Sequence, residues 1–459
     1  MRVRYLRLYY APMQSSTSSR ILFIVYEYPP SAGGGGQRIT KFTRYLTAAG
    51  WSLHVLTAEL VPGRPTDNSL LAEVAGVPVT KLPARHVAAA IARMLKPLRF
   101  ARPMVAGTVA AGASAGSGVS GGQRPLSSRI SRWLAVPDDA LFWSKRVPAV
   151  AKRLHAEHGF SAILASGPPY STLVAAVRAG RELGLPVVVD MRDPWVGNLH
   201  AKWPTAWHQR RFAELEREVM TAAAGVTAVS DVIAEECIEM GASGAIVIPN
   251  GFDPTDMPRW APVEDAPLKL AFLGQFSPRL SDPSDIFVAL ARAREIEPRL
   301  QHATIDVLGA ESPWAIEAAE QAGVADAVTF HGFKPYAEAL AAVSSADAGL
   351  LILPDGPGSA GVYSGKLFDY LGMGIPVLLY GPAKGAAGKL VAGANAGLVV
   401  PFGDVDAMVR TLCELAVAKA EHRAVTAPDA DVLAPFDRTK QVATLSAEIE
   451  RVVRGADAR

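Results

Sequence analysis

The fold is decided by the stretch Tyr363-Ser-Gly-Lys366-Leu-Phe-Asp369-Tyr-Leu-Gly-Met-Gly374-Ile-Pro376-Val377. A loop of small residues leads into a short helix, and a Gly-x-Pro turn leads from that helix into an apolar strand. The free N–H groups at the start of the helix and the Lys366 ammonium can hold phosphate oxygens. Asp369 lies one turn later on the same face, where it can accept hydrogen bonds from a ribose diol. The stretch therefore predicts a nucleotide-binding helix within an α/β sheet.

Apolar runs of strand length alternate with helical segments on both sides of this stretch. This alternation is typical of parallel sheets that are covered by helices on both faces. In the first half we expect strands at Ile21–Val25, Ser52–Thr57, Val79–Leu82, Ala162–Ala165, Val187–Asp190, Gly225–Val229 and Ile246–Ile248. In the second half we expect strands at Leu268–Leu273, Ile305–Leu308, Val328–Phe330, Ala348–Leu353, Val377–Tyr380 and Leu398–Val400. The predicted fold class is α/β, with two Rossmann-like, doubly wound parallel-sheet domains.

Changes in composition predict the domain boundaries. Residues 1–20 lack the apolar core and cleavage site of a signal peptide, so we expect a disordered extension or an early start codon. The first domain is expected at 21–253, with a mobile loop rich in Gly, Ala and Ser at about 104–125. A linker at 254–267 leads into the second domain at 268–435. A final helix within 436–459 can pack back on the first domain.

The bulk composition excludes several classes of protein. The chain has 459 residues and a formal net charge of +2, which is too small for a general nucleic-acid binder. Its two cysteines, Cys237 and Cys413, lie far apart. This spacing excludes a disulfide framework and a cysteine-rich metal site, and it favours a reducing cytoplasm. No apolar run is long enough to cross a membrane.

Three motifs of the first half follow strands, at the edge where open α/β sheets bind ligands. They read Tyr28-Pro-Pro-Ser-Ala-Gly33-Gly-Gly-Gly36-Gln-Arg38, Ala165-Ser-Gly167-Pro168-Pro169-Tyr170-Ser171 and Asp190-Met-Arg192-Asp193-Pro194-Trp195. The glycines of the first motif allow close approach of backbone to a ligand. The third motif gathers two carboxylates, a guanidinium and an indole at one strand end. Asp190 and Asp193 are therefore candidates for orienting a hydroxyl group or for acting as a base.

Two motifs near the middle of the chain complete the pattern. Pro249-Asn250-Gly251 follows the last strand of the first half as a tight turn. Phe272-Leu-Gly274-Gln-Phe-Ser-Pro-Arg279 opens the second half. Its glycine lets backbone approach a ligand, and its arginine can bind a diphosphate through two parallel hydrogen bonds.

Each motif also has a simpler interpretation. The glycine-rich segment can be a flexible loop, and the paired prolines can make a rigid turn without a ligand. An Arg–Asp pair in the third motif can simply tie loops together. Arg279 can be a surface arginine, and Lys366 can be a solvated lysine. For Lys366 the simpler interpretation is weaker, because a cation in the first turn opposes the helix dipole unless an anion binds nearby.

Taken in order, these motifs resemble those of GT-B glycosyltransferases, in particular family 4 (glycosyl transferases group 1), whose donor pattern reads roughly S-x-K-x-x-E-Y-x-x-x-G-x-P. The resemblance spans residues 21 to about 453. It implies two domains that close over a nucleotide-sugar, an acceptor entering from the first domain, and retention of anomeric configuration. It further implies three groups of residues. The catalytic group is Asp190, Arg192, Asp193, Arg279 and Lys366. The donor-binding group is Gly274, Arg279, Gly309, Gly332, Phe333, Ser364, Lys366, Leu367 and Asp369. The acceptor or cleft group is Gly34, Gly35, Arg38, Pro169, Tyr170, Trp195 and Asn250.

One departure from the family concerns the donor sugar. Family 4 commonly has two glutamates in an E-x7-E pattern, whereas this chain has Gly361 in the first place and Asp369 in the second. The first acid is usually associated with the donor sugar. A backbone contact from residues 358–362, Glu27, or the pair Asp190 and Asp193 can substitute for it, and the sequence does not choose among these.

The sequence also bears on metals, cofactors and membranes. No D-x-D motif of the metal-dependent type stands in a suitable place, so we expect neither a metal nor a cofactor, with the nucleotide-sugar as a substrate. The segment 85–133 combines an apolar helix face with several cations, and it can either rest on an anionic membrane surface or pack on its own domain. The expected location is the cytoplasm, with peripheral binding to the inner membrane face.

The predicted activity is transfer of a hexosyl group from a nucleotide-sugar to a glycan, lipid-linked or small-molecule acceptor, in cell-surface polysaccharide or glycoconjugate synthesis. Two alternatives stay open. A GT-B nucleotide-sugar epimerase shares the fold but needs acid and base carboxylates around the sugar C2. A non-catalytic nucleotide-sugar-binding protein is consistent with Gly361 in place of the first acid.

Overall fold

The computed structural model describes residues 19–31, 34–60, 66–84, 133–197, 203–356, 361 and 363–457. Residues 1–18 of the expected extension, the loop at 104–125 and residues 85–132 of the expected membrane segment lie outside the described residues. The chain divides into two compact units. Unit 1 contains the described residues up to Pro249 together with those from Gln441 onward, and unit 2 is Asn250–Lys440.

Unit 1 is built on a seven-stranded sheet with the order β3-β2-β1-β4-β5-β6-β7. Every neighbouring pair is parallel. The strands are β1 (Arg20–Ile24), β2 (Ser52–Ala58), β3 (Val79–Leu82), β4 (Ala162–Gly167), β5 (Val187–Met191), β6 (Gly225–Ala228) and β7 (Ile246–Val247). These strands confirm the seven that the sequence predicts for the first half.

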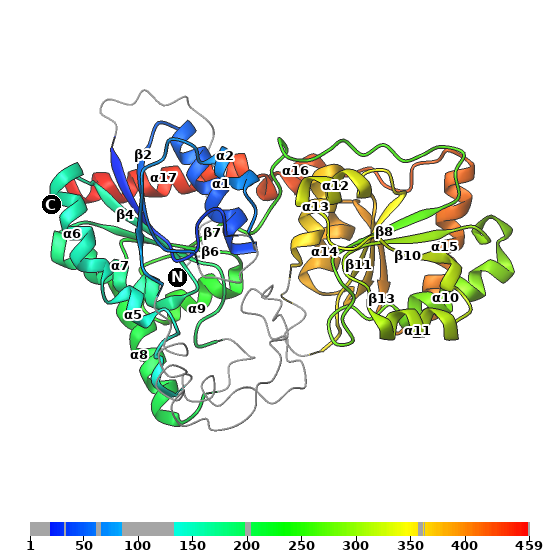
Figure 1. Cartoon of the computed structure of the whole chain (residues 1–459), viewed down its shortest axis with the longest axis horizontal. Helices are drawn as coiled ribbons and strands as arrows, with labels where there is room; N and C mark the ends of the chain where they lie inside the picture. The colour runs from blue at the N-terminus through cyan, green and yellow to red at the C-terminus, as the bar shows by residue number, and fades with distance from the viewer. Residues whose placement is uncertain are drawn as a thin grey trace, which may run out of the picture. The chain divides into compact units, whose positions relative to one another are not determined.

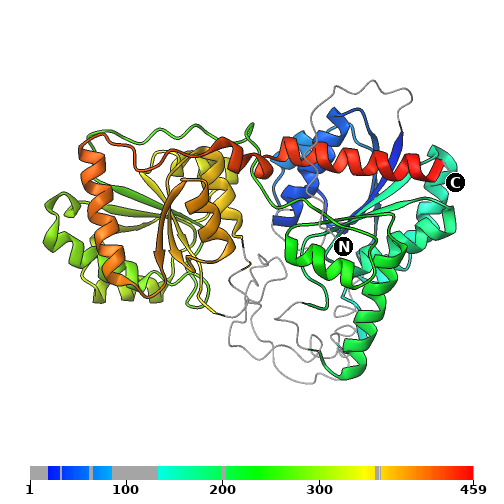
Figure 2. The ribbon, with the colours of Figure 1, turned by 180° about the vertical axis from the view of Figure 1, so that it is seen from behind.

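Helices cover both faces of this sheet (Figure 1). One face carries α5 (Leu141–Ser144), α6 (Val147–His158), α7 (Tyr170–Leu183), α8 (Ala206–Ala222) and α9 (Asp231–Glu239). The other face carries α1 (Gly34–Ala48), α2 (Ser69–Glu73) and the C-terminal helix α17 (Arg438–Asp457), which crosses the sheet in Figure 2. Leu445 and Ile449 of α17 pack with Phe23 of β1 in one buried cluster. The last helix is thus part of the core of unit 1.

Unit 2 is built on a six-stranded parallel sheet with the order β10-β9-β8-β11-β12-β13. Its strands are β8 (Lys269–Leu273), β9 (Thr304–Leu308), β10 (Val328–Phe330), β11 (Ala348–Ile352), β12 (Val377–Gly381) and β13 (Gly397–Pro401). They confirm the six strands predicted for the second half. The two sheets together confirm the predicted fold class.

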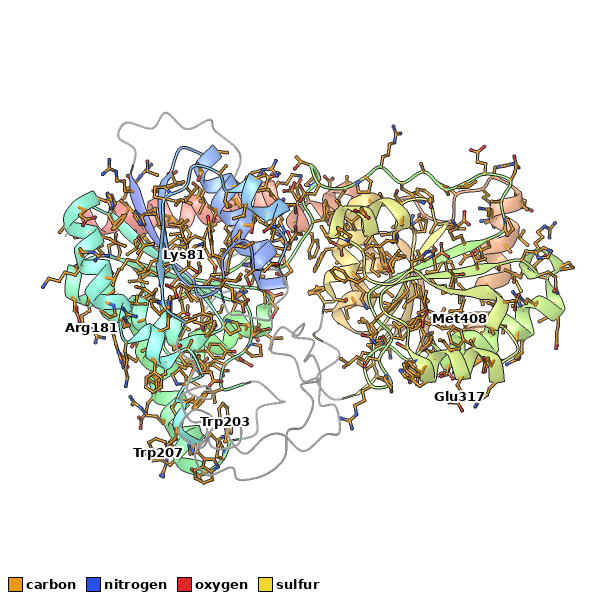
Figure 3. All side chains as sticks on the ribbon, viewed as in Figure 1. Lys81, Arg181, Trp203, Trp207, Glu317 and Met408 are labelled. Atoms are coloured by element: carbon orange, nitrogen blue, oxygen red, sulfur yellow. The ribbon has the colours of Figure 1, made fainter. Side chains whose placement is uncertain are left out.

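The helices of unit 2 also form two layers. One layer holds α10 (Ser284–Ile296), α11 (Pro313–Gln321) and α15 (Val405–Ala420), and the other holds α12 (Tyr336–Val343), α13 (Gly365–Met373) and α14 (Ala386–Gly393). The short helix α16 (Ala430–Leu433) precedes the final helix. Figure 3 shows Met408 of α15 in the core and Glu317 of α11 at the surface. No helix among the described residues is long and apolar enough to cross a membrane.

The segment that the sequence predicts as a linker at 254–267 is part of unit 2. Phe252, Met257 and Trp260 pack against the apolar cluster that includes α13. The Trp260 indole also donates a hydrogen bond of 2.8 Å to the carbonyl of Ala346. The boundary between the units therefore lies at Pro249, a few residues earlier than predicted, because these aromatic side chains are packed rather than solvated.

Strand order places the ligand-binding edge of each unit. The order reverses between β1 and β4 in unit 1 and between β8 and β11 in unit 2. Open α/β sheets bind ligands at such switch points, beside the carboxyl ends of the strands. In unit 2 the two segments that leave this point are the Gly274 turn after β8 and the chain from β11 to α13.

Candidate active site

The position of α13 in unit 2 is fixed by Tyr370. Its hydroxyl lies 3.0 Å from the Leu273 nitrogen, 3.2 Å from the Ala271 carbonyl and 3.1 Å from the Leu350 carbonyl. Its ring packs so closely on the Cα of Gly349 that a Cβ there would lie 2.6 Å from it. One buried side chain therefore holds α13 against both β8 and β11, at the switch point of the sheet.

Lys366 stands in the first turn of α13 and reaches back over β8. Its ammonium nitrogen lies 4.0 Å from the centre of the Phe272 ring, a cation–π contact. Its side chain is half-buried and forms no hydrogen bond or ion pair with another described residue. Burial lowers the pKa of Lys366 to about 8, although Asp369 opposes the shift. This arrangement leaves a cation available to an anion at the start of the helix.

The glycines of the neighbouring turns make room for that lysine. Gly274 has a φ of +95°, which favours glycine, and a Cβ there would lie 3.3 Å from Cε of Lys366. A Cβ on Gly309 would overlap the carbonyl group of Gly274. The Gly274 N–H donates to the carbonyl of Leu308 at 2.9 Å. The turns after β8 and β9 therefore lie against each other and against Lys366, with no side chain between them.

Asp369 lies one turn after Lys366 and is engaged by a residue that the sequence analysis missed. The hydroxyl of Tyr336, the first residue of α12, donates a hydrogen bond of 2.6 Å to Oδ1 of Asp369. Burial raises the pKa of Asp369 to about 6, while Tyr336, Arg438 and Lys366 oppose the shift. No sequence pattern links two residues that stand 33 positions apart, so only the structure reveals this pair.

The remaining donor-side residues differ in accessibility. Ser364 is the half-buried N-cap residue of α13, and its side chain makes no capping bond. Gly332 has a φ of +68°, and Phe333 is 89% exposed beside it. Gly361 is exposed, and a Cβ there would meet no atom within 4 Å. This edge of unit 2 therefore presents an open turn and an exposed aromatic ring to a ligand.

Two donor-side expectations need correction. The Leu367 side chain is fully buried in the core, and its amide already donates to the Ser364 carbonyl at 3.1 Å, so it offers no group to a ligand. Arg279 is exposed at the tip of the turn that Ser277 and Ser281 close, and its guanidinium forms no hydrogen bond or ion pair with a described residue. Nothing in the described structure holds Arg279 at Lys366.

In unit 1 the centre of the predicted site is a buried ion pair. Arg38 and Asp190 are both fully buried, and the guanidinium donates two hydrogen bonds to the carboxylate, of 2.7 and 3.1 Å. The hydroxyls of Ser166 and Thr227 donate two more, at 2.7 and 2.9 Å. Arg38 also donates to the carbonyls of Ile248 and Pro249. The network therefore joins α1 to β4, β5, β6 and the end of β7.

This network corrects the roles that the sequence predicts for Arg38 and Asp190. The Arg38 charge lowers the pKa of Asp190 against the effect of burial, so the carboxylate stays ionised. A carboxylate that is shielded from solvent and accepts four hydrogen bonds cannot take a proton from a substrate hydroxyl. Arg38 and Asp190 therefore have a structural role, because they hold together the strand ends that carry the site. The sequence placed Ser166 in the motif with the paired prolines but gave it no role, and Thr227 was missed because a single hydroxyl residue in a strand carries no recognisable pattern.

Arg192 directly follows β5, two residues after Asp190. Its guanidinium donates to the carbonyls of Gly167, at 3.3 Å, and Pro168. A Cβ on Gly35 would overlap the guanidinium, so the glycine-rich segment serves to admit Arg192. Burial lowers the pKa of Arg192, and Asp190 and Asp193 oppose the shift. The structure thus brings Arg192 together with Gly35, at the start of α1, where Gly34 is the first residue.

The turn after Arg192 is held by two stacked aromatic rings. Tyr170 and Trp195 lie 4.5 Å apart between ring centres and 8° from parallel, and the Tyr170 hydroxyl donates to the Pro194 carbonyl at 2.7 Å. Trp195 is only 1% exposed, which corrects the expectation that it faces an acceptor. Pro169 is the N-cap residue of α7, and Asn250 is half-buried at the start of unit 2.

Asp193 is the carboxylate of this turn that stays partly exposed. Its side chain accepts no hydrogen bond from a described residue. Burial raises its pKa, and the Arg192 charge opposes the shift. A small pocket also lies at this edge of the sheet, beyond β1 and β2. It is lined by Tyr26, Glu27, Tyr28, Pro29, Pro30, Ser31, Thr57, Ala58, Glu59, Leu60 and Lys81.

The decisive comparison is a match of residues 33–251 to the family described as "Glycosyl transferase 4-like domain". This part of the chain is similar in sequence to that family. The matched segment contains strands β2 to β7 and includes Asp190, Arg192 and Asp193, together with Arg38 of α1. No curated protein matches the chain in sequence.

Solved structures have a similar fold over nearly the whole chain. Sucrose-phosphate synthase from Thermosynechococcus elongatus has a TM-score of 0.56 and 15% identity, over 95% of this chain and 100% of that one. Anabaena HepE in complex with UDP-glucose has a TM-score of 0.54 and 16% identity, over 93% and 99%. A protein of Listeria monocytogenes described as a UDP-N-acetylglucosamine 2-epimerase has a TM-score of 0.53 and 11% identity, over 95% and 96%. At these identities the likeness shows the fold, which is GT-B.

Beneath the Trp195 turn lies a pair of acidic residues that the sequence analysis missed. Glu216 of α8 is 1% exposed and accepts a hydrogen bond of 3.1 Å from the Val196 N–H. The carboxyl group of Glu236 of α9 packs against Cα of Gly197, and its Oε2 atom has no partner among the described residues. Burial, with Glu236 adding to it, raises the pKa of Glu216 to about 7, while Val196 and Arg217 oppose the shift.

We expect Asp190→Asn and Asp193→Asn to differ sharply in stability. The first removes the charge that compensates buried Arg38 and should lower the free energy of unfolding by about 3–5 kcal/mol. The second removes a half-buried carboxylate without a hydrogen-bond donor and should change it by less than about 1 kcal/mol. Urea unfolding of the two variants measures both values. Equal losses would contradict the central role of Asp190.

Glu216→Gln should flatten part of the pH dependence of stability. The folded chain holds the Glu216 proton more tightly than the unfolded chain, because its pKa rises from 4.5 to about 7 on folding. This contribution is present at low pH and is lost as the pH rises through that window, by about 3 kcal/mol. Urea unfolding at pH 5 and pH 8 should therefore show a smaller loss in the variant.

The matched control for that measurement is Glu214→Gln, on the same helix, where the carboxylate is exposed and pairs with Arg211 at 2.9 Å. It should keep the pH dependence of the wild type. An unchanged pH dependence in Glu216→Gln would show that Glu216 is ionised throughout this range.

Proposed function

We propose that the protein is a glycosyltransferase of hexosyltransferase type that uses a nucleoside diphosphate sugar and retains the anomeric configuration. The observation that carries the proposal is Lys366. Its ammonium lies over Phe272 beside Gly274, at the start of α13, without an ion pair among the described residues. A half-buried cation in the first turn of a helix is unfavourable alone and becomes favourable when an anion binds. A diphosphate supplies that anion.

The chemistry that follows is stabilisation of the leaving group. When the bond between the anomeric carbon and the β-phosphate oxygen breaks, negative charge develops on the departing nucleoside diphosphate. Lys366 and the N–H groups of α13 face that charge from a partly desolvated position, where electrostatic interactions are stronger than in water. The fold likeness to Anabaena HepE, which is solved with UDP-glucose, supports a nucleotide-sugar as the ligand.

Unit 1 supplies the acceptor side in this proposal. Asp193 is our candidate for orienting the acceptor hydroxyl or taking its proton. Its carboxylate is partly exposed, and burial raises its pKa, which makes it a stronger base. Arg192 is fixed beside it by the carbonyls of Gly167 and Pro168. The acceptor class that we propose is a glycan, a lipid-linked sugar or a small molecule, used in cell-surface polysaccharide or glycoconjugate synthesis.

We further propose that the protein works in the cytoplasm and binds the inner membrane face peripherally through residues 85–133. Trp133 closes that segment and is 54% exposed. Its ring lies 5.3 Å from that of His208, which also contacts the 55% exposed Trp207 at 4.9 Å. Figure 3 shows Trp207 at the end of α8, near Trp203. Exposed indoles are enriched where proteins meet the membrane interface.

An epimerase is the second candidate function, since the likeness to the Listeria protein points to it. A nucleotide-sugar-binding protein without catalysis is the third. The test is to incubate the protein with UDP-, GDP-, ADP- and dTDP-sugars and to follow nucleotide release and the sugar configuration by NMR. We expect slow release of nucleoside diphosphate from one donor. Interconversion of the sugar would indicate the epimerase, and saturable binding without turnover would indicate the binding protein.

Lys366→Met should weaken binding of the matching nucleoside diphosphate by about 10- to 100-fold, which is the usual effect of losing a hydrogen bond to a charged group. In the wild type, affinity should fall as the pH rises above about 8, because free Lys366 then loses its proton. The variant should lack this fall. Calorimetric titrations between pH 7 and pH 9.5 measure both effects, and equal affinities at pH 7 would refute the assignment.

A further inference from the structure

Two ligand-facing segments of unit 2 are joined by one hydrogen bond. Tyr336 begins α12 directly after the turn that holds Gly332 and Phe333, and its hydroxyl donates to Oδ1 of Asp369 on α13 at 2.6 Å. Among the described residues it is the one hydrogen-bond donor to this carboxylate, and Oδ2 stays available. We propose that Tyr336 is a positioning residue that holds Asp369 as an acceptor for a ribose hydroxyl and couples the 331–335 turn to α13. This inference rests on the proposed function.

The direction of the bond is fixed by the surroundings of the tyrosine. Burial and the Asp369 charge raise the pKa of the Tyr336 hydroxyl, so it remains protonated and acts as the donor. Its ring packs with Tyr363 and Phe436 on the apolar cluster that contains Phe368 of α13. The ring is therefore held in place on the same core as the helix that carries Asp369, and the hydroxyl has a defined position.

Asp369 needs such a partner because its environment disfavours the ionised form. Three groups oppose the effect of burial: the hydroxyl of Tyr336, the charge of Arg438 and the charge of Lys366. The Tyr336 hydroxyl is the first of these causes, so its removal should protonate a larger share of Asp369 at neutral pH. A protonated carboxyl accepts hydrogen bonds less well than a carboxylate. Tyr336 thus acts through Asp369 and need not touch the ligand.

The coupling also explains how an aspartate can stand where the family pattern has a glutamate. The aspartate side chain is one methylene shorter and rotates about fewer bonds. With Oδ1 held by Tyr336, the second oxygen is presented in one orientation. The exposed Phe333 lies three residues before Tyr336, so the turn that carries it is tied to the same carboxylate. The hydrogen bond between Tyr336 and Asp369 therefore links recognition of the ribose to the position of this turn.

The test is a double-mutant cycle with Tyr336→Phe, which keeps the ring, and Asp369→Asn, which keeps the shape of the side chain. Affinities of the nucleoside diphosphate that the wild type binds, and of its 2′- and 3′-deoxy forms, are measured by calorimetry from pH 5 to pH 8. We expect Tyr336→Phe to weaken the ribonucleotide by up to about tenfold and the matching deoxynucleotide much less. Adding Tyr336→Phe to Asp369→Asn should have little further effect.

The pH profile separates positioning from mere packing. In the wild type, affinity should fall as the pH drops through about 6, and Tyr336→Phe should move that fall to higher pH. Protonation of the phosphate itself, also near pH 6, is common to all variants and cancels in their ratio. The inference would be wrong, with the proposed function intact, if the effects of Tyr336→Phe and Asp369→Asn on affinity were additive. It would also be wrong if Tyr336→Phe left both the pH profile and the preference for the ribonucleotide unchanged. If the wild type bound no nucleoside diphosphate, the proposed function would fall and this inference with it.

Discussion

The candidate site of unit 2 depends on one interaction, in which the half-buried ammonium of Lys366 lies over the ring of Phe272. The contact between Lys366 and Phe272 requires a turn without side chains beside it, and Gly274 and Gly309 provide that turn. It also requires a helix that cannot shift, and the three hydrogen bonds of the Tyr370 hydroxyl anchor α13 to β8 and β11. The Phe272 ring and the Asp369 charge favour the ammonium, yet burial still lowers its pKa. A bound anion would offset the remaining cost, and a nucleoside diphosphate is the anion that we propose.

Unit 1 uses a buried charge in a different way. The Asp190 carboxylate accepts hydrogen bonds from Arg38, Ser166 and Thr227. It therefore holds the strand ends in place and is not free to react with a substrate. Its network fixes the strand ends from which Arg192 and Asp193 project. The glycine-rich segment beside it has a correspondingly modest role, since Gly35 leaves room for the Arg192 guanidinium. The candidates for contact with a ligand in this motif are therefore Arg192 and Asp193, which follow β5.

The strands and both sheets could be predicted because buried parallel strands are short, continuously apolar and separated by turn residues. The motifs at strand ends could be placed for the same reason, since the topology brings those ends to one edge. Burial could not be predicted. Asp190 and Asp193 belong to one motif, yet Asp190 is fully buried in its ion pair with Arg38 and Asp193 is partly exposed. Pairs such as Tyr336 with Asp369, or Glu216 with Val196, join distant positions that no local pattern connects.

The most direct test of the central claim is the pKa of Lys366 itself, measured by NMR of 13C-labelled lysine side chains, with Lys366→Met to assign the signal. The free protein should titrate near pH 8. Saturation with the nucleoside diphosphate should raise this pKa by about one to two units, as linkage demands when a phosphate stabilises the ammonium about 10- to 100-fold. A Lys366 pKa that is the same with and without bound nucleotide would contradict the account.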